Sequence, residues 1–188
     1  MSNISMTTSK RNAIVTVMLI SAFVSMLNQT ILNTALPAII KGLNITETTA
    51  QWLITGFMLV NGIMIPLTAF LMDKYSTRHL YIFSMAIFLL GSIVAAFSPT
   101  FSILMISRII QAIGAGILLP LMQFTVFTLF PAEQRGFAMG LAGVVVQSAP
   151  AIGPTLTGLF VDLFSWRMPF YLVSAIAAVA FILGCFLC

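Results

Sequence analysis

The charged residues of this 188-residue chain are few and widely spaced, and their spacing constrains its fold more than any other feature. Eight are basic and four are acidic. They leave six long uncharged runs, at 12–40, 48–72, 80–107, 109–132, 136–161 and 168–188. A helix needs about 20 predominantly apolar residues to cross the hydrocarbon core of a bilayer. Each run is long enough for one crossing, which predicts an all-α integral membrane protein.

The composition excludes the other broad classes of protein. Hydrophobic residues make up 60% of the chain and charged residues 6%, whereas soluble domains have about 45–50% and about 25%. Intrinsic disorder is excluded as well, because low hydrophobicity and high charge are what keep a chain unfolded. We attribute the net charge of +4 to residues that orient the helices, so no nucleic acid partner is expected. We also expect no metal site and no cofactor.

The break in the third run and the charged loops set the predicted helix boundaries. Ser98-Pro99-Thr100 interrupts that region, because proline cannot continue a helix and disfavours helical geometry in the residue before it. The predicted helices cover about 12–36, 50–72, 80–97, 102–128, 137–160 and 168–188. Residues 1–11 then form a tail, and residues 12–188 form one six-helix transmembrane bundle. The sixth run continues to the last residue, with no polar segment after it. We therefore expect the chain to be truncated within or just after its sixth helix.

The basic residues predict how the bundle is oriented. The N-terminal tail and the loops after even-numbered helices carry five of them, against two in the other loops, Lys41 and Arg167. The five are Lys10, Arg11, Lys74, Arg78 and Arg135. Because basic loops stay in the cytoplasm, we expect a plasma membrane protein with a cytoplasmic N-terminus. Trp52 and Trp166 fall near the external helix ends, where amphipathic rings favour the interface.

One cation, Arg108, falls inside a predicted helix, about two turns from its start. A charge at this depth costs at least about 2.5–3.5 kcal/mol, which makes it a functional candidate. Either Arg108 snorkels to the outer interface, or it faces an aqueous cavity and senses a proton or an anionic group. The polar Gln111 one turn away favours the second interpretation. Gly114 and Gly116 would let another helix approach closely.

Amides and prolines mark the first and fifth helices. Gln29 and Asn33 are spaced i, i+4 and share one face; they are either contacts between helices or the lining of a polar cavity. Gln147 precedes Pro150 and Pro154 in the fifth helix. Because two prolines free backbone carbonyls that need new partners, we expect this helix to be bent and tightly packed.

The loop between the second and third helices holds Asp73, Lys74 and Arg78. One interpretation is a solvated turn whose cations anchor both helices to anionic headgroups. In the other, Asp73 caps a helix N-terminus or pairs with a base in only one conformation.

Four segments of the chain, in order, resemble motifs of the major facilitator superfamily. Residues 69–78 resemble the motif that joins its second and third helices. Residues 104–114 are similar to its fourth-helix motif, and residues 149–158 to the fifth-helix motif of its antiporters. Residues 28–37, with Trp166-Arg167, resemble signatures of the fourteen-helix drug:proton antiporters, in particular lincomycin-type efflux proteins. The resemblance covers about residues 14–170, although Asn28 stands where many members carry an intramembrane Asp.

The resemblance implies a fold, a function and a set of site residues. The chain would be the N-terminal six-helix half-bundle of a proton-coupled multidrug efflux transporter, which works by alternating access and is not an enzyme. Its partners would be membrane lipid, an amphipathic small-molecule substrate, the proton and a missing C-terminal half-bundle. Helices 1, 2, 4 and 5 would face the path, and helices 3 and 6 the lipid. Two alternatives remain open: a sugar or organic acid transporter of the same fold, and an inactive or homodimerising six-helix fragment.

The site residues that the resemblance implies fall into four groups. They are Arg108 for proton coupling; Gln29, Asn33, Gln111 and Gln147 for the substrate path; Asp73, Lys74 and Arg78 for the conformational switch; and Gly153, Pro154 and Gly158 for the antiporter motif of helix 5.

Overall fold

The structure, a computed structural model, describes residues 8–187 and consists there of six long helices. Each of the six is long and apolar enough to cross a membrane, which confirms the predicted all-α transmembrane fold. The helices are α1 (Thr8–Leu43), α2 (Glu47–Lys74), α3 (Thr77–Ala96), α4 (Phe101–Leu129), α5 (Ala132–Leu163) and α6 (Met168–Leu187).

Hydroxyl side chains fix where three of the helices begin. The hydroxyls of Thr46, Ser76 and Thr100 accept hydrogen bonds from backbone N–H groups in the first turns of α2, α3 and α4, respectively. Such N-caps satisfy one of the donors that a helix start leaves unpaired. The α2 and α3 starts therefore lie three residues before the predicted positions, at the residue that follows each cap.

The first helix is longer than predicted at both ends. It continues through Pro37 to Leu43, so the predicted end at residue 36 is wrong. Proline removes one backbone hydrogen bond, but Ile39 beyond it is fully buried in an apolar cluster, and that packing holds the last turns in place. Asn44, the residue that follows the helix, has a φ of 51°, and the Ile45 N–H donates to the Ile40 carbonyl at 3.2 Å. This is the bond pattern of a Schellman C-cap.

The predicted N-terminal tail, residues 1–11, overlaps the start of this helix. Residues 8–11 belong to α1, and the remainder of the tail lies outside the described residues.

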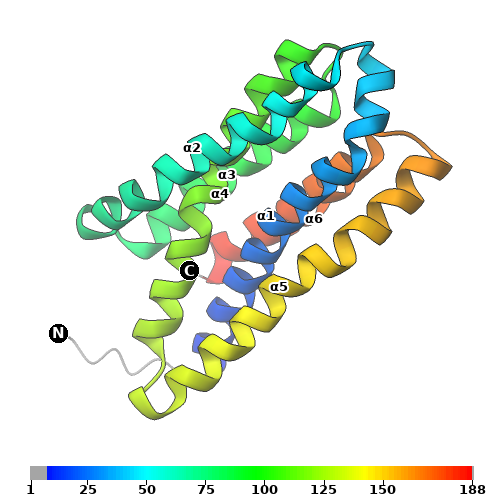
Figure 1. Ribbon diagram of the computed structural model, residues 1–188. Coiled ribbons are helices and arrows are strands. Elements are labelled where there is room, and N and C mark those ends of the chain that lie inside the picture. The colour runs from blue at the N-terminus through cyan, green and yellow to red at the C-terminus, as the bar shows by residue number, and fades with distance from the viewer. Residues whose placement is uncertain (1–7, 188) are drawn as a thin grey trace.

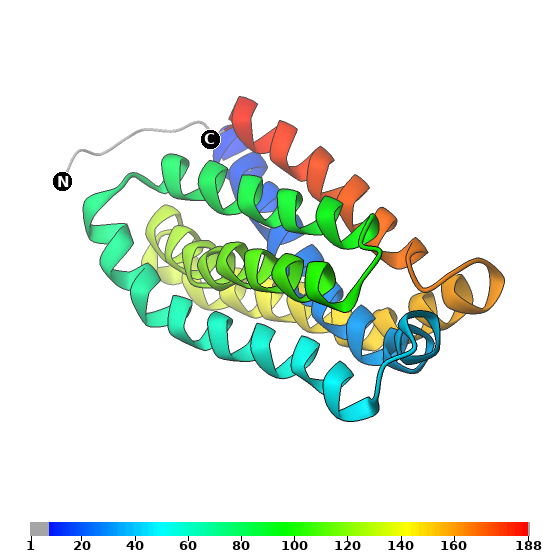
Figure 2. The same ribbon diagram turned by 90° about the horizontal axis from the view of Figure 1, so that it is seen from above.

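The six helices form two groups of three (Figure 1). In one group α2 and α3 pack on α4, and in the other α5 and α6 pack on α1. The two groups meet through α1 with α4 and through α3 with α6 (Figure 2). If α1, α2 and α3 are exchanged with α4, α5 and α6, respectively, the same set of contacting helix pairs is obtained. This is the pattern expected of two structural repeats.

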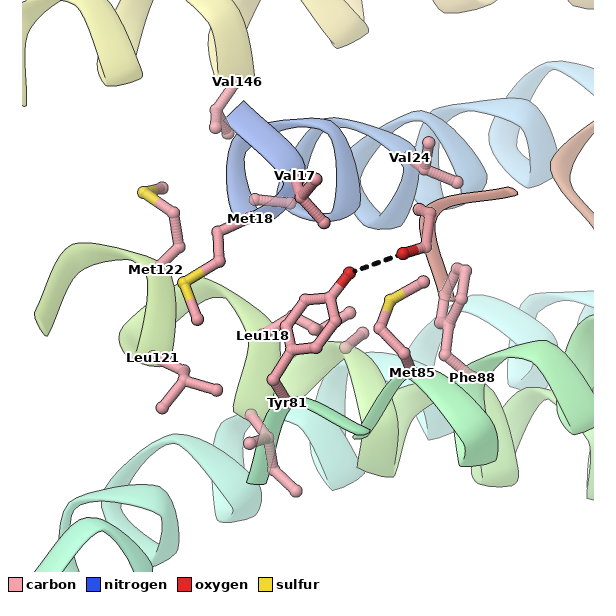
Figure 3. Packing of buried hydrophobic residues seen from close by; sticks show 14 of the residues in the cluster. Val17, Met18, Val24, Tyr81, Met85, Phe88, Leu118, Leu121, Met122 and Val146 are labelled. Carbon is pink, nitrogen blue, oxygen red and sulfur yellow. Dashed lines mark hydrogen bonds between the residues drawn. The ribbon is translucent and has the colours of Figure 1, made fainter. Parts of the chain in front are cut away.

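The largest apolar cluster contains residues of all six helices and surrounds Tyr81 (Figure 3). The Tyr81 hydroxyl donates to the Ala180 carbonyl at 3.0 Å and shares a 2.7 Å hydrogen bond with the Ser21 hydroxyl. Both bonds are buried. A tyrosine placed at the centre of the packing can thus keep its polar atom satisfied while it joins three helices.

Two glycines allow α3 and α4 to pack closely. A Cβ atom on Gly114 would lie 2.8 Å from the Cβ atom of Phe88, and one on Gly91 would lie 2.8 Å from the backbone nitrogen of Gln111. Both separations are too short for a side chain. The close approach predicted for Gly114 is therefore present, and α3 is the helix that makes it.

Two arginines connect α3 to α6, one at each end of the helix pair. Arg78, at the start of α3, donates from Nη2 to the Cys185 carbonyl in the last turn of α6 at 3.3 Å. At the other end, Arg167 Nη2 donates to the Ser98 carbonyl just after α3 at 2.9 Å. Because the helices are antiparallel, each one receives a cation near its C-terminus, where the helix dipole favours positive charge.

Trp166 lies at the predicted helix end but inside the protein. It is 8% exposed and packs against Gly42, where even a Cβ atom would meet the indole ring. The ring packs between helices at this end of the bundle, because the missing side chain of Gly42 leaves room for it. Trp52 is 57% exposed and remains available to the interface.

Candidate functional site

Arg108 points into the bundle rather than toward its surface. Its side chain is 1% exposed, and the guanidinium carbon lies 4.1 Å from the centre of the Phe57 ring on α2. Arg108 Nη1 donates a 2.7 Å hydrogen bond to Gln111 Oε1, one turn further along α4. The geometry contradicts the snorkelling interpretation, since a snorkelling cation would reach solvent or headgroups.

Gln111 extends this contact to a third helix. Its Nε2 donates to Ser92 Oγ at 3.0 Å, so Phe57, Arg108, Gln111 and Ser92 link α2, α4 and α3 through neutral groups around one cation. Arg108 Nε has no partner among the described residues. A buried charge without a carboxylate is costly, because neutral groups replace only part of its lost hydration.

The acidic side chains that the structure describes lie far from the interior. Glu47, Asp73 and Glu133 are all exposed at helix ends. Asn28 is 0% exposed, and neither the oxygen nor the nitrogen of its amide has a partner among the described residues. An unsatisfied buried group of this kind costs about 1–3 kcal/mol.

Two adjacent cavities open on the side of the bundle built by α1, α2, α4 and α5. The α5 cavity, of about 250 Å³, is lined by α1, α4 and α5, and the α2 cavity, of about 300 Å³, by α1, α2 and α4. Met26 and Leu119 line both, which places the two cavities side by side. These are the four helices that the resemblance expects to face the path, and no described residue of α3 or α6 lines either cavity.

The four candidate path residues fall in different places. Gln29 lines the α2 cavity and Gln147 the α5 cavity. Asn33 is exposed one turn beyond Gln29 and lines neither, while Gln111 is buried beside Arg108.

Two amides that sequence reasoning missed complete the cavity lining. Asn61 lines the α2 cavity and Gln123 the α5 cavity. Each is an amide within a long uncharged run, as Gln29 and Gln147 are, so the sequence contained the information.

The candidate switch residues lie at one end of the bundle without forming a common cluster. Asp73 is exposed near the end of α2, and Ser76, not Asp73, caps α3, so the interpretation of Asp73 as a helix cap is wrong. Ser76 takes that role because it occupies the last position before α3 begins. Lys74 Nζ lies 4.5 Å from the centre of the Phe70 ring, and Arg78 donates to the Cys185 carbonyl of α6.

The three motif residues of α5 lie in one unbroken helix. It runs from Ala132 to Leu163 with Pro150 and Pro154 inside it. Gly153 packs on α1, where its Cβ atom would lie 3.0 Å from that of Thr30. Gly158 faces open space, with no atom within 4 Å of a Cβ placed there among the described residues.

Comparison with known proteins identifies the fold. Residues 18–188 match the family model of the Major Facilitator Superfamily. The chain belongs to this superfamily. Its six helices therefore correspond to a half-bundle of the superfamily fold, as the sequence motifs predicted.

Three relatives show the range of similarity. The chain is 53% identical to the uncharacterized MFS-type transporter YcnB of Bacillus subtilis, over 93% of the chain and 37% of that protein. It is 42% identical to the lincomycin resistance protein LmrB of Bacillus subtilis, over 89% of the chain and 35% of the relative. It is 35% identical to the probable multidrug resistance protein EmrY of Escherichia coli, over 78% of the chain and 29% of the relative. The chain thus spans about a third of the length of these relatives.

Proposed function

We propose that this chain is the N-terminal half-bundle of a proton-coupled transporter that exports amphipathic small molecules by alternating access. The observation that carries the proposal is the separation of two features. An uncharged pair of cavities faces one side of α1, α2, α4 and α5, and a buried cation lies within the bundle on α4. The names of LmrB and EmrY, which refer to drug resistance, support the export of small molecules.

The substrate path in this proposal runs along the two cavities. Gln29 and Gln147 contribute polar contacts there, and a second half-bundle closes the open side. Rocking of the two halves about the midplane then exposes the path to one face of the membrane at a time. The N-terminus lies in the cytoplasm of a plasma membrane protein, as the distribution of basic residues indicates.

Arg108 acts electrostatically in the proposed coupling. A guanidinium stays protonated in proteins, so Arg108 does not carry the transported proton itself. It attracts a carboxylate that lies outside these six helices, and protonation of that carboxylate weakens the attraction. Gln111 and Phe57 hold the guanidinium in position while its counter-ion changes state.

The charged end of the bundle provides the proposed conformational switch. Arg78 fixes α3 to α6, which leaves the exposed Asp73 and Lys74 to contact the other half-bundle in one of its positions. In α5, Gly153 holds the helix against Thr30 of α1, while Pro154 and Gly158 belong to the face available to the second half.

Transport by everted membrane vesicles that contain this half-bundle together with its second half tests the coupling. An Arg108→Ala variant is expected to lose drug uptake driven by a pH gradient while still inserting in the membrane. Lys41→Ala, which removes an exposed cation, is the matched control and should transport normally. Normal export by a correctly inserted Arg108→Ala variant would refute the role of Arg108.

A further inference from the structure

The polar groups that line the two cavities are almost all amides. They are Gln29 and Asn61 in the α2 cavity and Gln123 and Gln147 in the α5 cavity, with the hydroxyl of Ser25 beside them. Within the described part of the chain, no charged residue lines either cavity. An amide offers two donors and an acceptor with two lone pairs. Such groups bind neutral donors and acceptors but do not compensate a full charge.

Methionines supply much of the remaining wall. Met26 lies between the cavities, Met58 lines the α2 cavity, and Met122 and Met139 line the α5 cavity. Methionine is unbranched and flexible, so it fills irregular gaps and adapts to ligands of different shape. Surfaces of this kind are typical of proteins that accept many partners.

The buried cation makes the cavities unfavourable for a positive solute. Ala115 lines the α2 cavity and lies seven residues from Arg108 on the same helix, which corresponds to about 10 Å along the helix axis. At an effective dielectric constant of about 20, two positive charges at that separation repel enough to weaken binding roughly tenfold. No lining carboxylate of the described chain offsets this repulsion, and the carboxylate proposed outside these six helices offsets it only while that carboxylate is ionised.

We infer that the two cavities together form a binding site for uncharged amphipathic molecules with hydrogen-bonding groups, which it prefers to their cationic analogues. Asn61 and Gln123 are specificity-determining residues of this site alongside Gln29 and Gln147. The inference rests on the proposed transport function, because it defines the substrate class of the same path.

An isosteric pair of probes tests the preference for neutral molecules. One is a dansyl amide whose tail ends in a tert-butyl group, and the other ends in a trimethylammonium group of the same shape. Their binding to the purified protein in nanodiscs is measured by fluorescence, without any ion gradient. The tert-butyl probe is expected to bind about tenfold more tightly.

Acidic substitutions test which residues set the preference. Asn61→Asp and Gln123→Glu are each expected to shift the affinity ratio toward the trimethylammonium probe by about tenfold. Asn44→Asp is the matched control, because Asn44 is exposed at the end of α1, about 22 Å along the helix from Gln29, and lines neither cavity. The affinity ratio of this variant should not change. The ratio in the unsubstituted protein tests the preference even if an acidic variant fails to insert.

Three outcomes would overturn the inference: tighter binding of the trimethylammonium probe, binding of neither probe, or an affinity ratio that well-folded acidic variants leave unchanged. Failure of the proposed function is distinguishable from each of these. A protein that prefers the neutral probe but shows no gradient-driven transport retains the binding site and loses the proposed coupling. Gradient-driven export of the trimethylammonium probe alone would support transport and refute the preference.

Discussion

The guanidinium of Arg108 stacks on the ring of Phe57, with its central carbon 4.1 Å from the ring centre. This contact joins α4 to α2 and presents the electron-rich face of a ring to a cation deprived of water. Cation–π pairs contribute about 2 kcal/mol or more when they are desolvated, well above their contribution at exposed sites. The position of the only described buried charge thus depends on an aromatic side chain from a different helix.

Phe57→Leu is expected to destabilise the bundle by about 2 kcal/mol, because leucine fills much of the volume without offering a ring face. Unfolding of the purified protein in mixed micelles measures the change. Phe57→Trp keeps a ring face and should restore part of the loss if the enlarged ring fits. Equal stability of the leucine variant and the parent would show that the stacking contributes nothing.

Gln111→Glu is expected to keep the protein folded but to abolish proton-coupled export. A glutamate at this position supplies a permanent counter-ion to Arg108, which then no longer responds to a distant carboxylate. Vesicle uptake driven by a pH gradient gives the readout. Ser92→Ala, which removes the acceptor for Gln111 Nε2 and the hydroxyl donor to the Phe88 carbonyl, should cost about 1 kcal/mol and leave export intact. Export by the glutamate variant would contradict the proposed coupling.

Asn28→Leu is expected to raise the stability of the bundle by about 1–3 kcal/mol, because it removes an amide that is buried without a partner. Leucine is close to asparagine in size and needs little repacking. The midpoint of unfolding measures the gain. A loss of stability would show that Asn28 has a partner, such as a water molecule, that satisfies its amide.

Gly153→Ala is expected to destabilise the contact between α5 and α1 by about 1–3 kcal/mol, because the new methyl group overlaps Thr30. Gly158→Ala is the matched control on the same helix. It meets open space and should gain up to about 1 kcal/mol from the higher helix propensity of alanine. Comparison of the two unfolding midpoints checks the prediction, and similar effects at both glycines would contradict it.

Arg167→Gln is expected to loosen the start of α6, since glutamine is too short to reproduce the bond to the Ser98 carbonyl. Amide hydrogen exchange should accelerate in the first turns of α6 and the last turn of α3. Lys74→Gln is the control, because Lys74 contacts only a ring of its own helix among its described interactions. Unchanged exchange in the Arg167 variant would show that the bond does not restrain these ends.

The number and position of the helices follow from the sequence because the bilayer imposes them. A run such as 109–132 is too long and too apolar to fold in water, and helical hydrogen bonding is the means by which it satisfies its backbone within lipid. The helix ends are less predictable. Pro37 stops a helix in isolation, yet α1 continues beyond it because Ile39 gains a buried position that no local rule contains.

The candidate site was predictable in composition but not in geometry. Intramembrane polar groups such as Arg108, Gln29 and Gln147 are conspicuous because they are costly in lipid. Which helix each of them meets depends on rotation and tilt, and these are set by packing between distant segments. The resemblance assigned Gln111 to the substrate path, whereas hydrogen bonds with Ser92 and Arg108 hold its side chain inside the bundle. Asn61 and Gln123 join the cavity lining only when α2 and α4 are assembled.

The buried position of Arg108 also gives the bundle an electrical property. A unit charge that crosses the whole membrane against 100 mV exchanges about 2.3 kcal/mol with the field. A rocking motion that carried the guanidinium through a tenth of that thickness would exchange about 0.2 kcal/mol, whatever the substrate. Because the partners of this cation in the described chain are neutral, its displacement would not be cancelled by an opposite charge moving with it. Membrane voltage would then act directly on the resting position of these helices.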